Sequence, residues 1–239
     1  MHWDFALIVL FFAIAVPLLG RRRIQQLLAA PETTKQDRLR LYASTIAFQW
    51  IAVAVILWRA SAHGISITDL GLAMGNPSLT AAVAISLTAL VLGNQVVALK
   101  RLSIDPQAVM GQLQQVALRI FPQDNAERAA FFFLVTTVAI CEEVIFRGFF
   151  QRLFESLAGN VTLVGILGSA ALFAVSHLYQ GRKGVIVTFV VGLIFSAIRA
   201  WTGSLLPSGT AHFFADLVVG LMAPGRILAA MQQDAKLIE

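Results

Sequence analysis

Hydrophobic residues run through this chain in stretches longer than those of ordinary soluble helices. Residues 41–58 and 78–99 contain no charged side chain at all. A helix needs about 20 predominantly apolar residues to cross a hydrocarbon core about 30 Å thick. Because both stretches approach or exceed this length, the pattern predicts helices that cross a lipid bilayer.

Seven stretches of this kind divide the chain. The expected spans are 4–20, 41–58, 78–99, 129–150, 161–178, 184–201 and 204–223. Pro17 is expected to kink or end the first span. Apolar residues at helical spacing extend the fourth span to Leu157, and Ala158-Gly159-Asn160 is typical of a helix stop. The predicted fold class is all-α: a polytopic transmembrane helical bundle of about seven spans, or eight as the alternative, around a polar intramembrane cavity.

The composition agrees with a membrane protein. Hydrophobic residues make up 58% of the 239 residues and charged residues 13%, against about 25% charged residues in soluble domains. The lipid bilayer is therefore the first expected partner. The net charge of +5 does not indicate nucleic-acid binding, because no basic run is interleaved with aromatic residues. The single cysteine, Cys141, excludes an internal disulfide and a thiolate metal cluster.

Basic residues predict how the chain is oriented. Fourteen of the 18 Lys and Arg residues fall on one side, in 20–40, 100–128, 179–183 and the tail after 223. This side is predicted to be cytoplasmic, with the N-terminus outside and the C-terminus inside. The short loops favour a bacterial plasma membrane. The connection 100–128 is expected to form either an interfacial amphipathic helix or a plain connecting helix.

Ionisable side chains occur within the later spans, where they are rare and costly. A charge at the centre of a bilayer costs at least about 2.5–3.5 kcal/mol on insertion scales. The candidates for a functional site are Glu142, Glu143, Arg147, His177, His212 and Asp216. Arg199, beside Trp201 at the end of a span, is interpreted instead as an anchor at the membrane interface.

The spacing of these residues predicts pairs. Glu143 and Arg147 are four residues apart and share a helix face, as do His212 and Asp216. Glu142 points about 100° away from Glu143 in an α-helix, so the two glutamates are expected to have different roles.

The depth of the residues also predicts a common site. Glu142 lies 17 residues before the turn at Gly159, and His177 lies 18 residues after it. At about 1.5 Å per residue both lie about 25 Å from that turn. His212 reaches the same level only if its helix is tilted or displaced.

A glutamate and two histidines in a partly dry pocket suit hydrolysis. The carboxylate can act as general base on a water molecule, and a histidine can stabilise charge that develops on a carbonyl oxygen. The alternative is a divalent metal such as zinc bound by Glu142, His177 and His212, which would then activate the water.

Three motifs follow one another on successive spans. They are Glu142-Glu143-Val-Ile-Phe-Arg147, Phe173-Ala-Val-Ser-His177 and His212-Phe-Phe-Ala-Asp216. Together they resemble the motifs of the CPBP intramembrane proteases, also called the Abi or CAAX prenyl endopeptidase family. The stretch 69–72, Asp-Leu-Gly-Leu, also resembles a segment of bacterial members.

The resemblance implies a role for each motif. Glu142 would activate water, and Glu143 with Arg147 would support it. His177 would bind or polarise the scissile carbonyl group, with Phe173 beside the substrate, while His212 and Asp216 would complete the polar end of the cavity. The last motif position often carries Asn. An ionised Asp216 cannot donate to an oxyanion, so Asp216 is either protonated, orients His212, or strengthens a metal site.

The implied function is an endopeptidase that hydrolyses a peptide bond of a membrane-embedded, lipidated or hydrophobic peptide, including CAAX-type C-terminal processing. No cofactor is expected, with zinc as the alternative. The implied division is 1–128 for the N-terminal helices and connecting helix, 129–223 for the catalytic core and 224–239 for a cytoplasmic tail. Other functions left open are a non-enzymatic immunity or scaffold protein and a proton-coupled transporter.

Overall fold

The computed structural model describes residues 2–104 and 112–238, with side chains up to Met222 except at 99 and 101–115. The described residues form helices and no strand. In chain order the helices are α1 (Trp3–Leu10), the π-helix η1 (Phe11–Ala15), α2 (Val16–Ala29), α3 (Lys35–Ala62), α4 (Pro77–Ile104), α5 (Gln112–Ile120), α6 (Asn125–Glu142), the π-helix η3 (Glu143–Phe150), α7 (Gln151–Leu157), α8 (Thr162–Ser176), the 3-10 helix η4 (Leu178–Gln180), α9 (Gly181–Thr202) and α10 (Leu206–Ile238).

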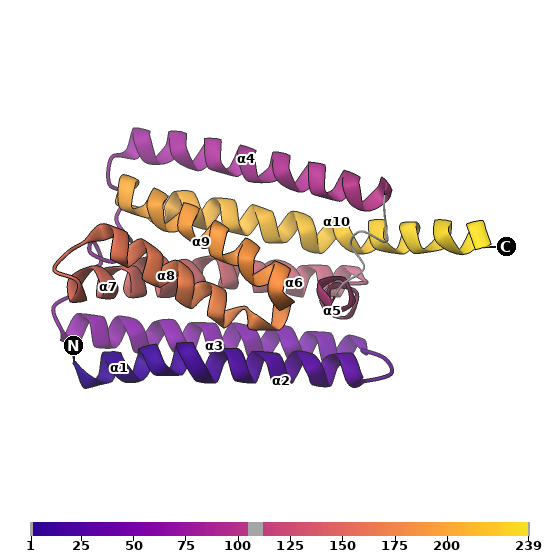
Figure 1. Cartoon of the computed structure of the whole chain (residues 1–239), viewed down its shortest axis with the longest axis horizontal. Coiled ribbons are helices and arrows are strands. Elements are labelled where there is room, and N and C mark those ends of the chain that lie inside the picture. Colours follow the sequence, from indigo (N-terminus) through magenta and orange to yellow (C-terminus); the bar gives the residue numbers. More distant parts are fainter. Residues whose placement is uncertain (1, 105–111, 239) are drawn as a thin grey trace.

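A membrane bundle is confirmed. Among the described residues, five helical segments are long and apolar enough to cross a bilayer: Trp3–Ala29, Lys35–Ala62, Pro77–Ala98, Asn125–Leu157 and Leu178–Thr202. The apolar helix α8 is shorter, and α10 occupies the position of the last expected span. Each of the seven expected spans therefore coincides with a helical segment (Figure 1).

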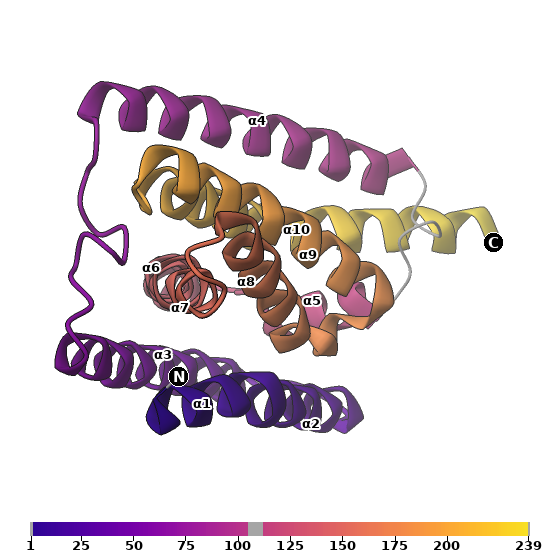
Figure 2. The same ribbon diagram turned by 60° about the vertical axis from the view of Figure 1, so that its left-hand side comes forward.

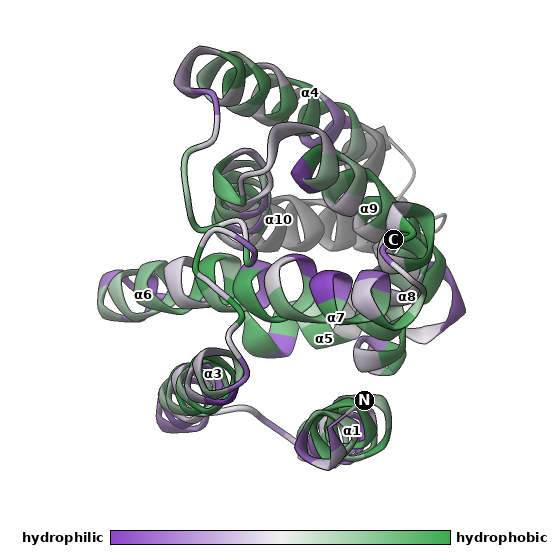
Figure 3. Ribbon diagram, turned by 90° about the vertical axis from the view of Figure 1, so that its left-hand side faces the viewer, coloured by the Kyte–Doolittle hydropathy of each residue, from purple (hydrophilic) through white to green (hydrophobic). Residues whose placement is uncertain are grey.

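The outer faces of the helices suit a hydrocarbon environment. Large apolar side chains such as Trp58, Ile85, Leu90 and Phe133 are each at least 65% exposed. Hydrophobic residues predominate along α1 and α4 (Figure 3). Such a surface would be unfavourable in water and is expected of helices that face lipid.

The structure shows how the first and last spans end. Of the two effects expected of Pro17, an end to the span does not occur, because the helix continues through Pro17, and the π-helix η1 ends two residues before it. A π turn adjusts the hydrogen-bond ladder next to a residue that has no N–H to donate. The last helix continues to Ile238, so residues 224–238 prolong α10 instead of leaving it.

The fourth span ends where the sequence indicates. The helix formed by α6, η3 and α7 runs to Leu157 and stops at Gly159 and Asn160, whose φ angles are +70° and +66°. In the loop 100–128, α5 forms a helix over residues 112–120, while residues 105–111 lie outside the described residues.

The α6–η3–α7 segment lies at the centre of the bundle. In its most apolar 18-residue window 56% of residues are buried, against 17–28% in the other four candidate spans. Viewed from the side, α1–α3 and α4 lie on opposite sides of the helices α6 to α9 (Figure 2). The site residues of this central segment are therefore surrounded by other helices.

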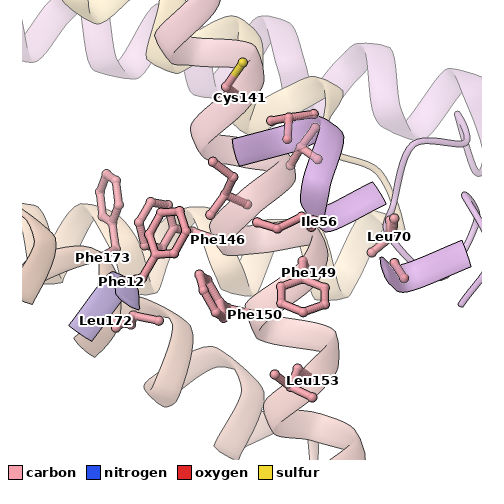
Figure 4. Packing of buried hydrophobic residues seen from close by; sticks show 14 of the residues in the cluster. Phe12, Ile56, Leu70, Cys141, Phe146, Phe149, Phe150, Leu153, Leu172 and Phe173 are labelled. Atoms are coloured by element: carbon pink, nitrogen blue, oxygen red, sulfur yellow. The ribbon is translucent and has the colours of Figure 1, made fainter. Parts of the chain in front are cut away.

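A cluster of phenylalanine rings forms the core around this segment (Figure 4). Phe146 and Phe150 of η3 pack edge-on against Phe12 of η1, with ring centroids 5.9 and 5.2 Å apart. Phe146 also lies 5.0 Å from Phe173 of α8. These rings join the first span to the motif-bearing helices.

Polar contacts set α3 against α6. The buried Arg38 donates to Glu127 at 2.8 Å, and Lys35 pairs with Asp124 at 2.6 Å. Asp124 also caps α6 by accepting the N–H of Glu127. Because these pairs join the first turns of both helices, α3 and α6 run in the same direction from a common end.

The segment between α3 and α4 does not cross the bundle but covers one end of it. Leu205 donates its N–H to the carbonyl of Gly71 at 2.8 Å. Arg199 donates to the carbonyl of Asp69 and is only 9% exposed. The position of Arg199 at a span end suggested an anchor at the membrane interface. Its guanidinium group instead turns inward and holds this segment.

Close packing of α8 against α7 leads to a prediction about stability. A Cβ atom at Gly165 would lie 2.3 Å from Glu155 Cγ and 2.7 Å from the Gln151 carbonyl oxygen. We expect Gly165→Ala to lower the free energy of unfolding by about 1–3 kcal/mol, because the backbone oxygen has to move. Gly93→Ala in α4 is the control, since nothing lies within 4 Å of its Cβ position. Thermal unfolding in one detergent compares them, and equal midpoints would contradict the packing argument.

Candidate active site

The two adjacent glutamates lie where the helix geometry changes. Glu142 is the last residue of α6 and Glu143 is the first residue of the π-helix η3. π-helical turns are rare and often occur at functional sites. Both carboxylates approach the same histidine, with oxygen-to-nitrogen distances to His212 of 3.9 Å from Glu142 and 3.0 Å from Glu143.

Glu143 and Arg147 form the buried pair that their spacing predicts. Arg147 Nη1 donates to Glu143 Oε1 at 3.0 Å, and both side chains are almost fully buried. The guanidinium carbon lies 4.0 Å from the ring centroid of Phe173 and 5.3 Å from that of Phe195. The faces of these rings stabilise a cation whose Nε and Nη2 have no hydrogen-bond partner in the described structure.

His212 joins the site despite its position near the start of α10. Its Nδ1 lies 3.0 Å from Glu143 Oε1, and its Nε2 lies 3.9 Å from Glu142 Oε2. The sequence spacing left open whether His212 reaches the same depth as Glu142 and His177. The structure brings His212 to the level of Glu142, and Glu143 is the residue that orients the imidazole ring.

His177 approaches the same carboxylate oxygen from α8. It is the residue at which α8 ends, and its Nδ1 lies 2.8 Å from the carbonyl oxygen of Phe173. Because a carbonyl oxygen only accepts, this nitrogen carries the hydrogen. Nε2 is thereby turned toward Glu142 Oε2, at 4.0 Å. The Phe173 ring lies 4.5 Å from the imidazole ring, so Phe173 packs against both Arg147 and His177.

One carboxylate oxygen and two imidazole nitrogens therefore converge on one small space. The side chains of Glu142, His177 and His212 are each 11–13% exposed, so the space is nearly enclosed. A water molecule hydrogen-bonds at about 2.8 Å, and one placed between atoms 4 Å apart is within reach of both. The arrangement is suited to holding and polarising a water molecule.

Asp216 lies at the open edge of this space. Its Oδ2 is 3.6 Å from His212 Nε2, slightly too long for a hydrogen bond, and its side chain is 41% exposed. Asp216 is thus placed beside His212 on the face opposite Glu143.

The same donor set bears on whether a metal fits. Two imidazoles and a carboxylate are ligands that zinc accepts, at about 2.0–2.2 Å each. Two ligands of a tetrahedral zinc ion are then about 3.3 Å apart, whereas the oxygen-to-nitrogen separations here are 3.9 and 4.0 Å. Among the described side chains, no group of three or more His, Cys, Asp or Glu is arranged to hold a metal ion. The residues suit zinc in kind, but their spacing does not match it.

Two further features were not anticipated from the sequence. Gln49 of α3 donates from Nε2 to Glu142 Oε1 at 3.1 Å. A single glutamine within an apolar span was the only signal for it. An apolar cavity of about 490 Å³ also lies between α6 and α10, and its wall includes Glu143, Gly209 and residues 71–74 and 204–206.

Comparison with known proteins supports the family that the motifs suggest. Residues 125–218 match the family model described as type II CAAX prenyl endopeptidase Rce1-like. The match covers 94 of the 239 residues and supports the CPBP family. No curated protein and no solved structure is similar enough to give a match. The CPBP match contains all three motifs and begins at the first residue of α6, whereas α1 to α4 lie outside it.

The buried pair gives a prediction that separates the two glutamates. Glu143→Gln leaves the Arg147 charge buried without a counter-ion, which costs about 3–5 kcal/mol when one partner of a buried pair is removed. Among the described side chains Glu142 pairs with no Arg or Lys, so we expect Glu142→Gln to unfold at nearly the temperature of the unmodified protein. Thermal unfolding in detergent measures both variants. Adding Arg147→Met to Glu143→Gln is expected to restore part of the stability, and no restoration would contradict the pairing.

Proposed function

We propose that this protein is an intramembrane endopeptidase that uses Glu142 to activate water. The observation that carries the proposal is the position of Glu142 Oε2, which faces the Nε2 atoms of His177 and His212 in a nearly enclosed space. The match of residues 125–218 to the Rce1-like family model supports a peptidase of the CAAX type.

In the proposed reaction, Glu142 takes one proton from the bound water as the water oxygen attacks the scissile carbonyl carbon. Negative charge then develops on the carbonyl oxygen. His212, protonated on both nitrogens, keeps its Nδ1–H bond to Glu143 and presents Nε2–H to that oxygen. When the tetrahedral intermediate collapses, Glu142 passes its proton to the leaving amine, so protons and electrons balance.

The remaining polar groups are proposed to hold this arrangement. Glu143 fixes the ring of His212 through Nδ1, and Arg147 compensates the charge of Glu143. Asp216 is proposed to stabilise the protonated form of His212, since an ionised aspartate cannot itself donate to the oxyanion. Phe173 is proposed to contact the substrate, as the resemblance to the family implies.

The proposed substrate is a membrane-embedded peptide, either hydrophobic or lipidated, and CAAX-type C-terminal processing is the specific form that the family match favours. No soluble domain is present among the described residues, so the substrate is expected to reach the site from within or beside the bilayer. No metal is required in the proposed mechanism. Zinc held by Glu142, His177 and His212 is the alternative that experiment must decide.

Peptide cleavage tests this proposal. The unmodified protein and Glu142→Gln are purified in detergent and incubated with prenylated and non-prenylated hydrophobic peptides, with and without a chelator. We expect cleavage by the unmodified protein, detected by mass spectrometry, and a loss of about 10²–10⁴-fold in rate in the variant, as for removal of a general base. Chelator resistance is expected. Chelator sensitivity would favour the zinc alternative, and equal rates in both proteins would contradict the role of Glu142.

We also propose that the N-terminus lies outside and the C-terminus in the cytoplasm, on the basis of the Lys and Arg bias. Ser61 and Gln36 are exposed near opposite ends of α3. We expect Ser61→Cys to react with a membrane-impermeant maleimide on intact cells, and Gln36→Cys to react only after lysis. Cys141 is buried, so it is not expected to react with the maleimide. The reverse pattern of labelling would contradict this orientation and indicate the opposite one.

A further inference from the structure

Gln49 is a buried amide that contacts the proposed general base. It lies in α3, is 8% exposed and donates from Nε2 to Glu142 Oε1 at 3.1 Å. Its own Oε1 is buried and has no hydrogen-bond partner among the described residues. The next buried residues along this face of α3 are Val53 and Ile56, which are apolar. Glu142 is therefore the one described side chain that compensates the burial of this amide.

The chemistry of the contact fixes its direction. An ionised carboxylate only accepts hydrogen bonds, so the amide nitrogen and not the amide oxygen must face Glu142. A bond to a charged acceptor is about twice as strong as a neutral one. The terminal torsion of a glutamate is otherwise broad and roughly two-fold. Holding Oε1 restricts that torsion and directs Oε2 toward the two imidazoles.

We propose that Gln49 is a positioning residue of the site, which holds one oxygen of Glu142 so that the other faces His177 and His212. Its effect on rate rests on the proposed peptidase function, but its effect on the Glu142 carboxyl group does not. Gln49 lies outside the matched residues 125–218, so the site is completed by a helix that the family match does not include.

The structure offers a matched control next to Gln49. Trp50 donates from Nε1 to Thr137 Oγ1 at 3.3 Å, which is also a contact between α3 and α6. Trp50→Phe removes this interhelical bond without touching Glu142. The Arg38–Glu127 pair remains in either variant and holds the two helices together. A loss caused only by looser helix packing should therefore appear in Trp50→Phe as well.

Labelling of Glu142 with dicyclohexylcarbodiimide tests the proposal without a substrate. This reagent modifies protonated carboxyl groups, and the modified peptide is quantified by mass spectrometry across a range of pH. Seven titratable or charged groups surround Glu142, and all are unchanged in every variant used: Cys141, Glu143, Arg147, His177, Tyr179, His212 and Asp216.

In Gln49→Met one oxygen of Glu142 has lost its hydrogen-bond donor, so the fraction of Glu142 that is labelled at a given pH should rise. Trp50→Phe should match the unmodified protein. Identical labelling curves for Gln49→Met and the unmodified protein would overturn the proposal, as would an equal displacement in Trp50→Phe.

Kinetics give a second readout with any peptide that the unmodified protein cleaves. Gln49→Met should lower kcat by about 10- to 100-fold, as expected for a displaced reacting group, and leave KM nearly unchanged. In Gln49→Glu a protonated carboxyl group still donates to Glu142, whereas an ionised one repels it. The rate of this variant relative to the unmodified protein should therefore fall as pH rises, and a ratio independent of pH would count against positioning.

The two proposals fail in different ways. If no peptide is cleaved but labelling of Glu142 moves in Gln49→Met alone, the positioning role stands and the peptidase function does not. If peptides are cleaved with unchanged kcat in Gln49→Met, the peptidase function stands and the positioning role is rejected.

Discussion

The buried pair of Glu143 and Arg147 is the interaction on which the arrangement of the site depends. In a bundle that faces lipid, neither charge is solvated by water, so each needs the other as its counter-ion. The pair also recruits helices from elsewhere in the chain. The carboxylate holds His212 of α10 through Nδ1, and the guanidinium group lies over Phe173 of α8. One ion pair within a single helix thus helps to fix the positions of two other helices, α8 and α10.

The second constraint comes from α3, which lies outside the residues that match the family. The Arg38–Glu127 pair sets the starts of α3 and α6 together, and both helices then run in the same direction. This register brings Gln49 level with Glu142. The matched helices therefore supply the carboxylates and histidines, while an unmatched helix supplies the contact that restrains one carboxylate. In this sense the site belongs to the whole bundle.

Sequence reasoning predicted what depends on local spacing. Long apolar runs located the seven helical segments, and spacing of four residues predicted the pairing of Glu143 with Arg147. It did not predict contacts set by tertiary packing. The inward turn of Arg199 depends on a carbonyl 130 positions earlier, and the partner of Gln49 lies 93 positions away. Nor does hydropathy distinguish the π-helical geometry of η3 from an α-helix, because both bury the same apolar residues.

Asp216, at the position where the family motif often carries Asn, changes how charge is distributed around His212. Glu143 lies against one ring nitrogen and Asp216 near the other, at 3.0 and 3.6 Å. An asparagine there would offer a neutral N–H donor to an oxyanion. An aspartate instead adds a second negative charge beside the ring, which compensates the positive charge of an imidazolium. In the proposed mechanism the donor that the motif has lost at position 216 is therefore replaced by the Nε2–H of His212 itself, one helical turn earlier.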